Sequence, residues 1–135
     1  MNDADIEIVK NCWVKIKSAK GAESFVNNFY QSFFKEHPEI RSLFPDDIGA
    51  LKIKLLFTLD NIINWLESIE MLENELIIIG KRHKALGVKK EMYDFFIKSI
   101  VISANISTNS ILTDKELTAW KNAFHKISDI MLKAY

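Results

Sequence analysis

The histidine at position 83 is the residue whose setting most strongly suggests chemistry. It follows an isoleucine run in the stretch IIIGKRHKALGV, residues 77–88. At helical spacing it shares one face with four apolar or small residues: Leu72, Leu76, Ile79 and Gly80. Its imidazole therefore points toward the protein interior, either as a core histidine hydrogen-bonded to a carbonyl or as a ligand to a metal or cofactor.

The sequence lacks the motifs that are typical of other kinds of functional site. The histidines at positions 37, 83 and 125 stand far apart, and the single cysteine adds no cluster, so a zinc site is not expected. The sequence has no Gly-x-Gly-x-x-Gly motif, phosphate loop or serine elbow, and no paired carboxylates in an apolar setting. Haem needs only one protein ligand and a broad apolar slot between helices, so a single buried histidine is compatible with haem.

Composition limits the class of protein and its partners. A chain of 135 residues has the size of one domain, and such a chain buries roughly 68% of its unfolded surface. Lys plus Arg and Asp plus Glu are both 18, which argues against nucleic acid or an anionic membrane as partner. A lone cysteine, Cys12, and an N-terminus unlike a signal peptide predict a cytoplasmic protein. We expect a single domain over residues 1–135, without a membrane span.

The elements that must position His83 are helices. The sequence has four Gly and two Pro, and its apolar residues recur at spacings of three and four, which predicts an all-α chain. We expect Asp3 to cap a first helix, Gly87 to stop the helix of His83 and Thr113 to cap the last helix. The shape of residues 67–75 is not predicted. Long helices are expected over residues 3–17, 21–34, 48–66, 89–107 and 113 to about 131. A short turn of helix is expected from Pro38 toward Phe44, and the helix of His83 is expected to end near residue 84.

Three motifs carry a family resemblance. FYQSFFKEHPEIRSLFP, GKRHKALGVKKEMY and LTAWKNAFHKISDIM occur in this order, and with them the whole chain resembles bacterial single-domain globins. The resemblance extends to Vitreoscilla-type haemoglobins and the haem domain of flavohaemoglobins. It implies a globin fold, a three-over-three helical sandwich around haem b (iron protoporphyrin IX), with His83 as the proximal ligand of the iron.

The resemblance also assigns the distal side. Phe44 matches the phenylalanine that packs on the haem, and Tyr30 matches the tyrosine that reaches a bound gas in many bacterial globins. A phenol in an apolar cavity can donate a hydrogen bond to bound dioxygen, with a contribution of roughly 0.5 to 3 kcal/mol. The alternative is that Tyr30 packs beside its phenylalanine neighbours with its hydroxyl on a carbonyl.

The helix expected over residues 48–66 supplies the distal side of the pocket, and it can be aligned with the family in two registers. Without a gap, Leu51 occupies the innermost position, and with a shift of one residue Lys52 occupies it. We favour Leu51 because it shares a stripe with Leu55 and Ile62. Leu55 then lies over the iron and Lys54 near a haem propionate. No distal histidine exists in this register, so ferrous iron is five-coordinate unless Tyr30 or Lys52 binds it.

On the proximal side, the resemblance implies that Arg82 reaches a propionate and that Val88, Tyr93 and Phe96 wall the pocket. Tyr93 matches a tyrosine that flavohaemoglobins link to the proximal histidine and to a glutamate of the final helix. We expect no counterpart of that glutamate, because the sequence ends at Tyr135. The sequence also shows no flavin or nicotinamide domain, so we expect NO dioxygenation only with an external reductase.

These observations predict reversible binding of O2, NO and CO, for O2 storage, transport or NO scavenging by the oxy form. No catalytic residue is expected, since the apolar distal side offers no acid or base to cleave an O–O bond. Two alternatives remain: an NO dioxygenase or weak peroxidase with a separate reductase, and a haem-based gas sensor or globin-fold interaction module.

Overall fold

The computed structural model describes residues 1–18, 21–109 and 111–135. In these ranges the secondary structure is helical without strands, which confirms the all-α prediction. None of the described helices is both long and apolar enough to cross a membrane. The elements are α1 (Asp3–Ser18), α2 (Gly21–Glu36), the 3₁₀ helix η1 (Pro38–Leu43), α3 (Gly49–Asn64), the 3₁₀ helix η2 (Leu66–Leu72), α4 (Glu73–Ala85), α5 (Glu91–Ser107), α6 (Asp114–Met131) and the 3₁₀ helix η3 (Leu132–Ala134).

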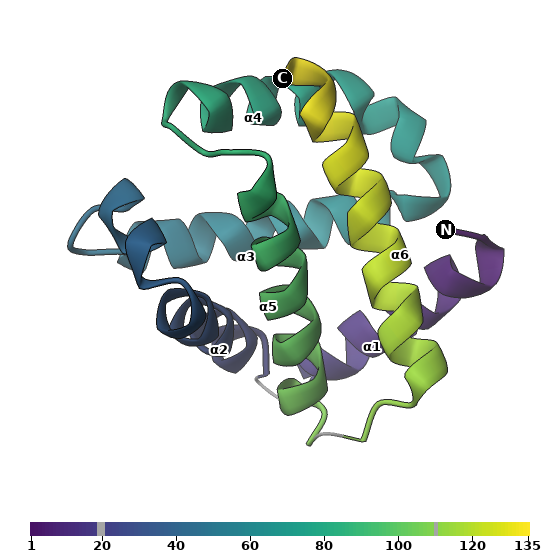
Figure 1. The fold of residues 1–135 in the computed structure, drawn as a ribbon. Helices are drawn as coiled ribbons and strands as arrows, with labels where there is room; N and C mark the ends of the chain where they lie inside the picture. Colours follow the sequence, from purple (N-terminus) through teal and green to yellow (C-terminus); the bar gives the residue numbers. More distant parts are fainter. Residues whose placement is uncertain (19–20, 110) are drawn as a thin grey trace.

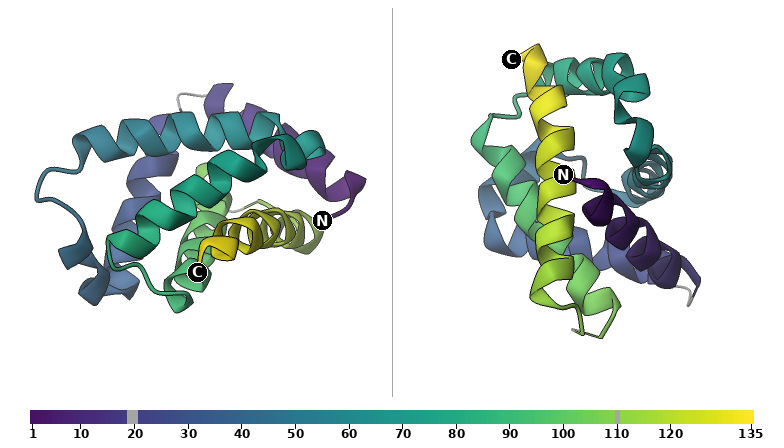
Figure 2. Two further views of the ribbon diagram at one scale, coloured as in Figure 1. Left: turned by 90° about the horizontal axis from the view of Figure 1, so that it is seen from above. Right: turned by 90° about the vertical axis from the view of Figure 1, so that its right-hand side faces the viewer.

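The helices pack as two crossed layers. α2 packs against α5 and α1 packs against α6, as Figure 1 shows. Seen from the side, α5 and α6 run along one side of the molecule and α1 and α3 along the other, while α4 closes the top (Figure 2). α4 packs on α6 and η3, so the C-terminus of the chain lies beside the helix that carries His83 (Figure 1).

Aromatic side chains fill the core between α1, α2 and α6. Phe25 meets the ring of Trp13 edge to face at 5.3 Å, and Trp120 stacks on Phe124 at 5.8 Å. The indole N–H of Trp13 donates to Asp60 at 2.9 Å, which ties α1 to α3. The four aromatic side chains are buried. Their close packing fixes the relative positions of the helices. It leaves the space between α2, α3, α4 and α5 for a cavity.

Two helix starts differ in how well the sequence predicted them. Thr113 caps α6 as predicted, in a capping box with Glu116 in which both hydrogen bonds are 3.1 Å long. The prediction that Asp3 caps the first helix is wrong, because Asp3 already lies inside α1. Asn2 caps the helix instead: its side-chain oxygen accepts from the backbone N–H of Asp5 at 2.8 Å.

The third helix ends earlier than predicted. α3 stops at Asn64, and the chain continues as the 3₁₀ helix η2, with a non-helical Ser68 inside it (φ −130°, ψ 40°). Leu66 continues the apolar stripe and is buried, but it does so from the tighter 3₁₀ turn. The same turn accounts for most of residues 67–75, whose shape the sequence did not indicate.

Gly87 ends the helix of His83 as predicted. Its φ of +94° is the left-handed conformation that favours glycine. The backbone N–H of Val88 then donates to the carbonyl of His83 at 2.9 Å, and that of Gly87 to Lys84 at 3.1 Å. This closed helix end fixes the turn between α4 and α5, and α5 begins at Glu91 rather than at Lys89.

Candidate functional site

A cavity of about 460 Å³ lies between α2, α3, α4, α5 and α6. Its volume is typical of small-ligand and cofactor sites. All ten site residues expected from the sequence line it, although their roles toward haem remain predictions. They are Tyr30, Phe44, Leu51, Lys54, Leu55, Arg82, His83, Val88, Tyr93 and Phe96.

His83 lies in the last turn of α4, half-buried at the wall of this cavity. Its Nδ1 is 3.3 Å from the hydroxyl oxygen of Tyr93, so its hydrogen-bond partner is a phenol rather than a carbonyl. Burial lowers the pKa of His83 below its ordinary value, which favours the neutral imidazole. With Nδ1 held by Tyr93, Nε2 is the ring nitrogen available to a metal.

Tyr93 comes from the first turn of α5 and is itself buried. Burial raises the pKa of its hydroxyl above the ordinary value of 10.0, and the neighbouring Tyr135 raises it further. Tyr93 is therefore a neutral phenol at any physiological pH. The oxygen of a neutral phenol can accept a hydrogen bond from Nδ1–H of His83 while the proton stays on the imidazole.

Tyr30 reaches the cavity from α2, which lies at the lower left of Figure 1, while α4 lies at the top. Phe29 packs on its ring at 5.0 Å and Phe44 at 5.9 Å, both edge to face. Burial raises the pKa of its hydroxyl to about 12. In the described part of the chain this hydroxyl makes no hydrogen bond to protein, so it is available to a molecule inside the cavity.

The wall formed by α3 bears on the choice between the two registers. Leu51, Leu55 and Thr58 line the cavity at helical spacing, whereas Lys52 is not among the lining residues. This placement supports the register without a gap. Lys54 lines the cavity and is exposed, as is Arg82 on α4, so both cations stand at its solvent edge.

Several lining residues were not predicted as part of a site. Thr58 was missed although it lies one turn after Lys54, and Ser128 was missed because a small polar residue interrupts the apolar stripe of α6. Ile79, Ile127 and Met131 were recognised only as apolar faces of their helices. The remaining lining residues are Phe29, Phe33, Ile40, Leu43, Pro45, Leu59, Ile62, Leu86, Met92 and Phe124.

The chemistry of this cavity fits a haem group. The half-buried imidazole of His83, which burial keeps neutral, could ligate the iron, and the walls are mostly aliphatic and aromatic. The cations of Lys54 and Arg82 at the solvent edge could pair with the carboxylates of the group. A multi-ligand metal site does not fit, because the described residues contain no group of three or more His, Cys, Asp or Glu side chains able to hold a metal.

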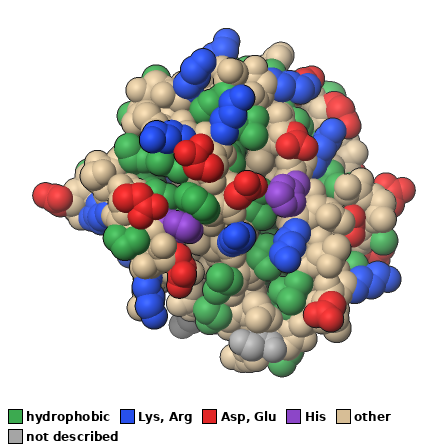
Figure 3. Space-filling view, in the orientation of Figure 1, with side chains coloured by type: hydrophobic (Ala, Val, Ile, Leu, Met, Phe, Trp, Pro, Cys, Tyr) green, Lys and Arg blue, Asp and Glu red, His purple; other side chains and the backbone are tan. Residues whose placement is uncertain are grey.

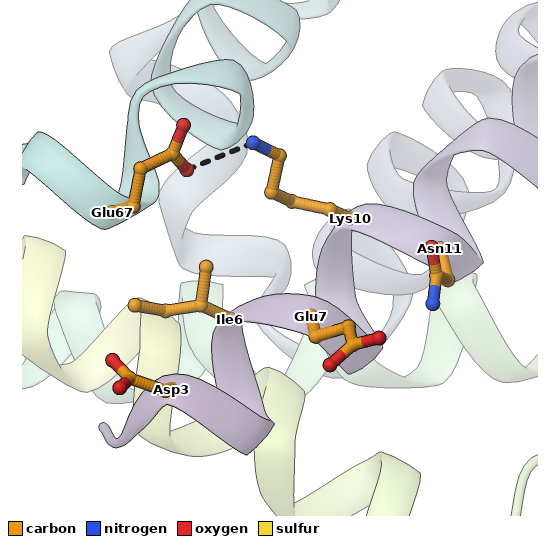
Figure 4. Close-up of a pocket in the computed structure, with 6 residues that line it drawn as sticks. All are labelled: Asp3, Ile6, Glu7, Lys10, Asn11 and Glu67. Atoms are coloured by element: carbon orange, nitrogen blue, oxygen red, sulfur yellow. Dashed lines mark hydrogen bonds and ion pairs between the residues drawn. The ribbon is translucent and has the colours of Figure 1, made fainter.

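A second hollow lies at the surface between α1 and η2. It is lined by Asp3, Ile6, Glu7, Lys10, Asn11 and Glu67, as Figure 4 shows. Lys10 pairs with Glu67 across it at 2.8 Å, so part of its charge is already neutralised. The hollow offers no chemistry comparable to that of the buried cavity.

Acidic and basic side chains are mixed over the face of the molecule that Figure 3 draws.

Comparison with known proteins agrees with this geometry. The flavohemoprotein of Bacillus subtilis strain 168 is 25% identical over 98% of this chain and 33% of its own length. A flavohemoprotein of Bacillus cereus strain ATCC 14579 is 30% identical over 94% of this chain and 31% of its own length. This chain therefore spans about one third of the curated relatives it matches.

Solved structures show the same fold. A bacterial globin from Campylobacter jejuni superposes with a TM-score of 0.83, 25% identity and 99% coverage of both chains. An engineered carbene transferase, derived from a putative nitric oxide dioxygenase of Rhodothermus marinus, superposes with a TM-score of 0.84 at 18% identity, over 99% of this chain and 93% of its own. The expected globin fold is thus confirmed.

The family assignment rests on a direct match to the sequence. The globin family model matches residues 27–131, which is well over half of the chain and includes the helices that line the cavity. Haem binding is implied by the family and by the flavohemoprotein relatives. The chain belongs to the globin family.

Proposed function

We propose that the protein is a haem b globin that reversibly binds O2, NO and CO at an iron held by His83. One observation carries the proposal: a single apolar cavity has the neutral imidazole of His83 on α4 and the unpaired hydroxyl of Tyr30 on α2. When bound, haem b supplies an iron that takes up a diatomic gas reversibly.

On the proximal side, Tyr93 fixes which nitrogen of His83 serves as ligand. Its oxygen would accept a hydrogen bond from Nδ1–H across 3.3 Å, which leaves Nε2 as the nitrogen that would ligate the iron. Lys54 and Arg82 at the exposed edge would hold the propionates, and Val88, Phe44 and Phe96 would pack against the haem.

On the distal side, Tyr30 supplies the polar contact. Its hydroxyl remains protonated at physiological pH, since burial raises its pKa to about 12, and it donates to a polar gas molecule in the cavity. Leu51 and Leu55 keep the remaining wall apolar and exclude water. The α3 residues that line the described cavity include neither a histidine nor a carboxylate, which favours gas binding over O–O cleavage.

An optical spectrum of the protein expressed with haem tests the proposal. We expect one broad visible band in the dithionite-reduced form, because five-coordinate ferrous haem has an open distal position, and sharper bands after CO is added. Split bands in the reduced protein would mean that a second side chain ligates the iron. A protein without a Soret band would contradict the proposal and favour a haem-free interaction module.

NO scavenging is the second activity we propose. The matched relatives carry the name flavohemoprotein, which indicates a flavin-containing partner for the same haem domain. For repeated turnover, a reductase has to return ferric haem to ferrous. The oxy form should consume NO once per haem, and continued turnover should require added reductase. Turnover without any reductant would contradict this assignment.

A further inference from the structure

Tyr135 contacts the proximal network, although the sequence assigned it no role. Its ring meets the ring of Tyr93 at 90° with centroids 5.6 Å apart. Its hydroxyl donates to the carbonyl oxygen of Val88 at 2.8 Å. Tyr135 is half-buried, so these contacts are made at the edge of the protein interior.

Both partners of Tyr135 are also partners of His83. The backbone N–H of Val88 donates to the carbonyl of His83 at 2.9 Å, and the hydroxyl of Tyr93 lies 3.3 Å from its Nδ1. Tyr135 is therefore anchored to the turn that follows His83 while its ring restrains the side chain that holds the imidazole. Side chain and backbone form a closed set of contacts around the proposed ligand.

The segment that carries Tyr135 is attached along α4. Lys133 forms an ion pair with Glu73 at the start of α4, and the ammonium of Lys84 near its end lies 5.9 Å from the ring centre of Tyr135. η3 and the end of α6 pack on α4, as Figure 1 shows. The segment that ends at Tyr135 is thus packed against the helix that carries His83.

We propose that Tyr135 is a positioning residue that holds Tyr93 and thereby sets the orientation and hydrogen bonding of the His83 imidazole toward haem iron. The inference rests on the proposed function. A hydrogen-bond acceptor at the second nitrogen of a ligating histidine orients the ring and raises its basicity. Tyr93 can do this only while its own ring is held in place, and Tyr135 supplies the contact that holds it.

The test is resonance Raman spectroscopy of the reduced, haem-loaded full chain. In Tyr135→Phe, which loses the anchor on Val88, the iron–histidine stretching band should move to lower frequency and broaden. Tyr135→Leu, which also loses the aromatic edge, should move it further. Lys133→Ala is the matched control, because it breaks an ion pair of the same segment but leaves both tyrosines in place, and its band should equal that of the wild type.

A double variant shows whether Tyr135 acts through Tyr93. In a Tyr93→Phe background the band is already shifted, and adding Tyr135→Phe should not move it further. A further shift, an unmoved band in both single Tyr135 variants, or an equal shift in Lys133→Ala would overturn the proposal. A wild type without a Soret band overturns the proposed function and this inference with it, whereas haem-loaded protein with an unmoved band overturns this inference alone.

Discussion

The imidazole of His83 combines two properties that a haem ligand needs. It is neutral, because burial lowers its pKa, and one of its nitrogens already has a partner in Tyr93. The protein also contains an exposed histidine, His125 on α6, which lies outside the cavity. Comparing substitutions at His83 and His125 therefore distinguishes loss of an iron ligand from the general effect of losing an imidazole.

The first prediction concerns His83→Ala. Loss of the ligand should weaken haemin binding by at least about 100-fold, since even outer-shell partners of a metal ligand typically contribute 10- to 100-fold. Added free imidazole should restore part of the Soret absorbance. His125→Ala is the control and should bind haemin like the wild type in the same titration. Unchanged affinity in His83→Ala would mean that another side chain holds the iron.

The second prediction concerns the hydroxyl of Tyr30. Tyr30→Phe retains the ring packing against Phe29 and Phe44 but removes the donor. O2 release should accelerate about 2- to 150-fold, as loss of a hydrogen bond of roughly 0.5 to 3 kcal/mol predicts. Stopped-flow displacement of O2 by CO measures this rate. Because the pKa of Tyr30 is about 12, its titration should leave the wild-type rate unchanged between pH 6 and pH 9. Equal rates in the two proteins would show that Tyr30 does not contact the gas.

At the scale of elements, α4 holds the proposed ligand, and its approach to α6 depends on a glycine. A Cβ added at Gly80 would lie 2.2 Å from the carbonyl oxygen of Met131 and 2.9 Å from its carbonyl carbon. Both atoms are backbone, so the clash cannot be relieved by a change of rotamer. The two helices would have to move apart, and the wall of the cavity with them.

Gly80→Ala should therefore lower the free energy of unfolding by about 1 to 3 kcal/mol, the usual cost of overpacking. Urea unfolding followed by circular dichroism measures the loss. Gly49→Ala is the control, because the added Cβ meets only the side-chain oxygen of Asp47, at 3.2 Å, and its effect should stay within about 1 kcal/mol. If both variants were equally stable, α4 and α6 would not be in close contact.

The junction of α1 and α3 predicts a dependence of stability on pH. Hydrogen bonds from Lys17 and Trp13 hold the pKa of Asp60 below its ordinary value of 3.8. A carboxyl whose pKa is lower in the folded state contributes stability above its unfolded pKa and loses it as pH falls through the folded pKa. Its contribution should therefore be constant at neutral pH and decline as the pH falls below about 4.

Asp60→Asn tests this prediction. The amide oxygen can still accept from Trp13, but the charge that pairs with Lys17 is lost. The difference in unfolding free energy between wild type and variant should be largest near pH 7 and shrink toward pH 3, as urea titrations at a series of pH values would show. A difference that stays constant across this range would mean that the charge of Asp60 contributes nothing.

At the scale of the whole molecule, a tightly packed core lies beside the cavity. The side chains between α1, α2 and α6 are closely packed, whereas residues of α2, α3, α4, α5 and α6 line the cavity. A ligand that fills this space binds the folded chain and not the unfolded one, so it must stabilise the fold.

Haemin should raise the melting temperature of the haem-free protein. At a free concentration 100 times its dissociation constant, the gain in unfolding free energy is about 2.7 kcal/mol, which corresponds to several degrees for a domain of this size. Thermal scans with and without haemin measure the change, and His83→Ala should show a smaller one. An unchanged melting temperature in the wild type would argue that the cavity does not hold haem.

The sequence alone predicted most of the helices, the inward direction of His83 and ten site residues that all line one cavity, while the roles of these residues toward haem stay predictions. Periodic spacing and family motifs carry this information, because both are local to a helix or a short segment. The preference for Leu51 over Lys52 came from the apolar stripe and is supported by the lining of the cavity, whereas the participation of Thr58 and Ser128 and the capping of α1 by Asn2 became visible only in the structure.

Tertiary structure also decided which side chains of different helices meet. Spacing places His83 on a helix face, but only the turn from α4 into α5 brings Nδ1 to Tyr93. Only the return of the chain beside α4 brings Tyr135 to both Tyr93 and Val88. The need for Gly80 likewise comes from a backbone 51 positions later in the chain, at Met131. Contacts between distant segments depend on how helices pack, and periodicity within one helix does not record the packing angle.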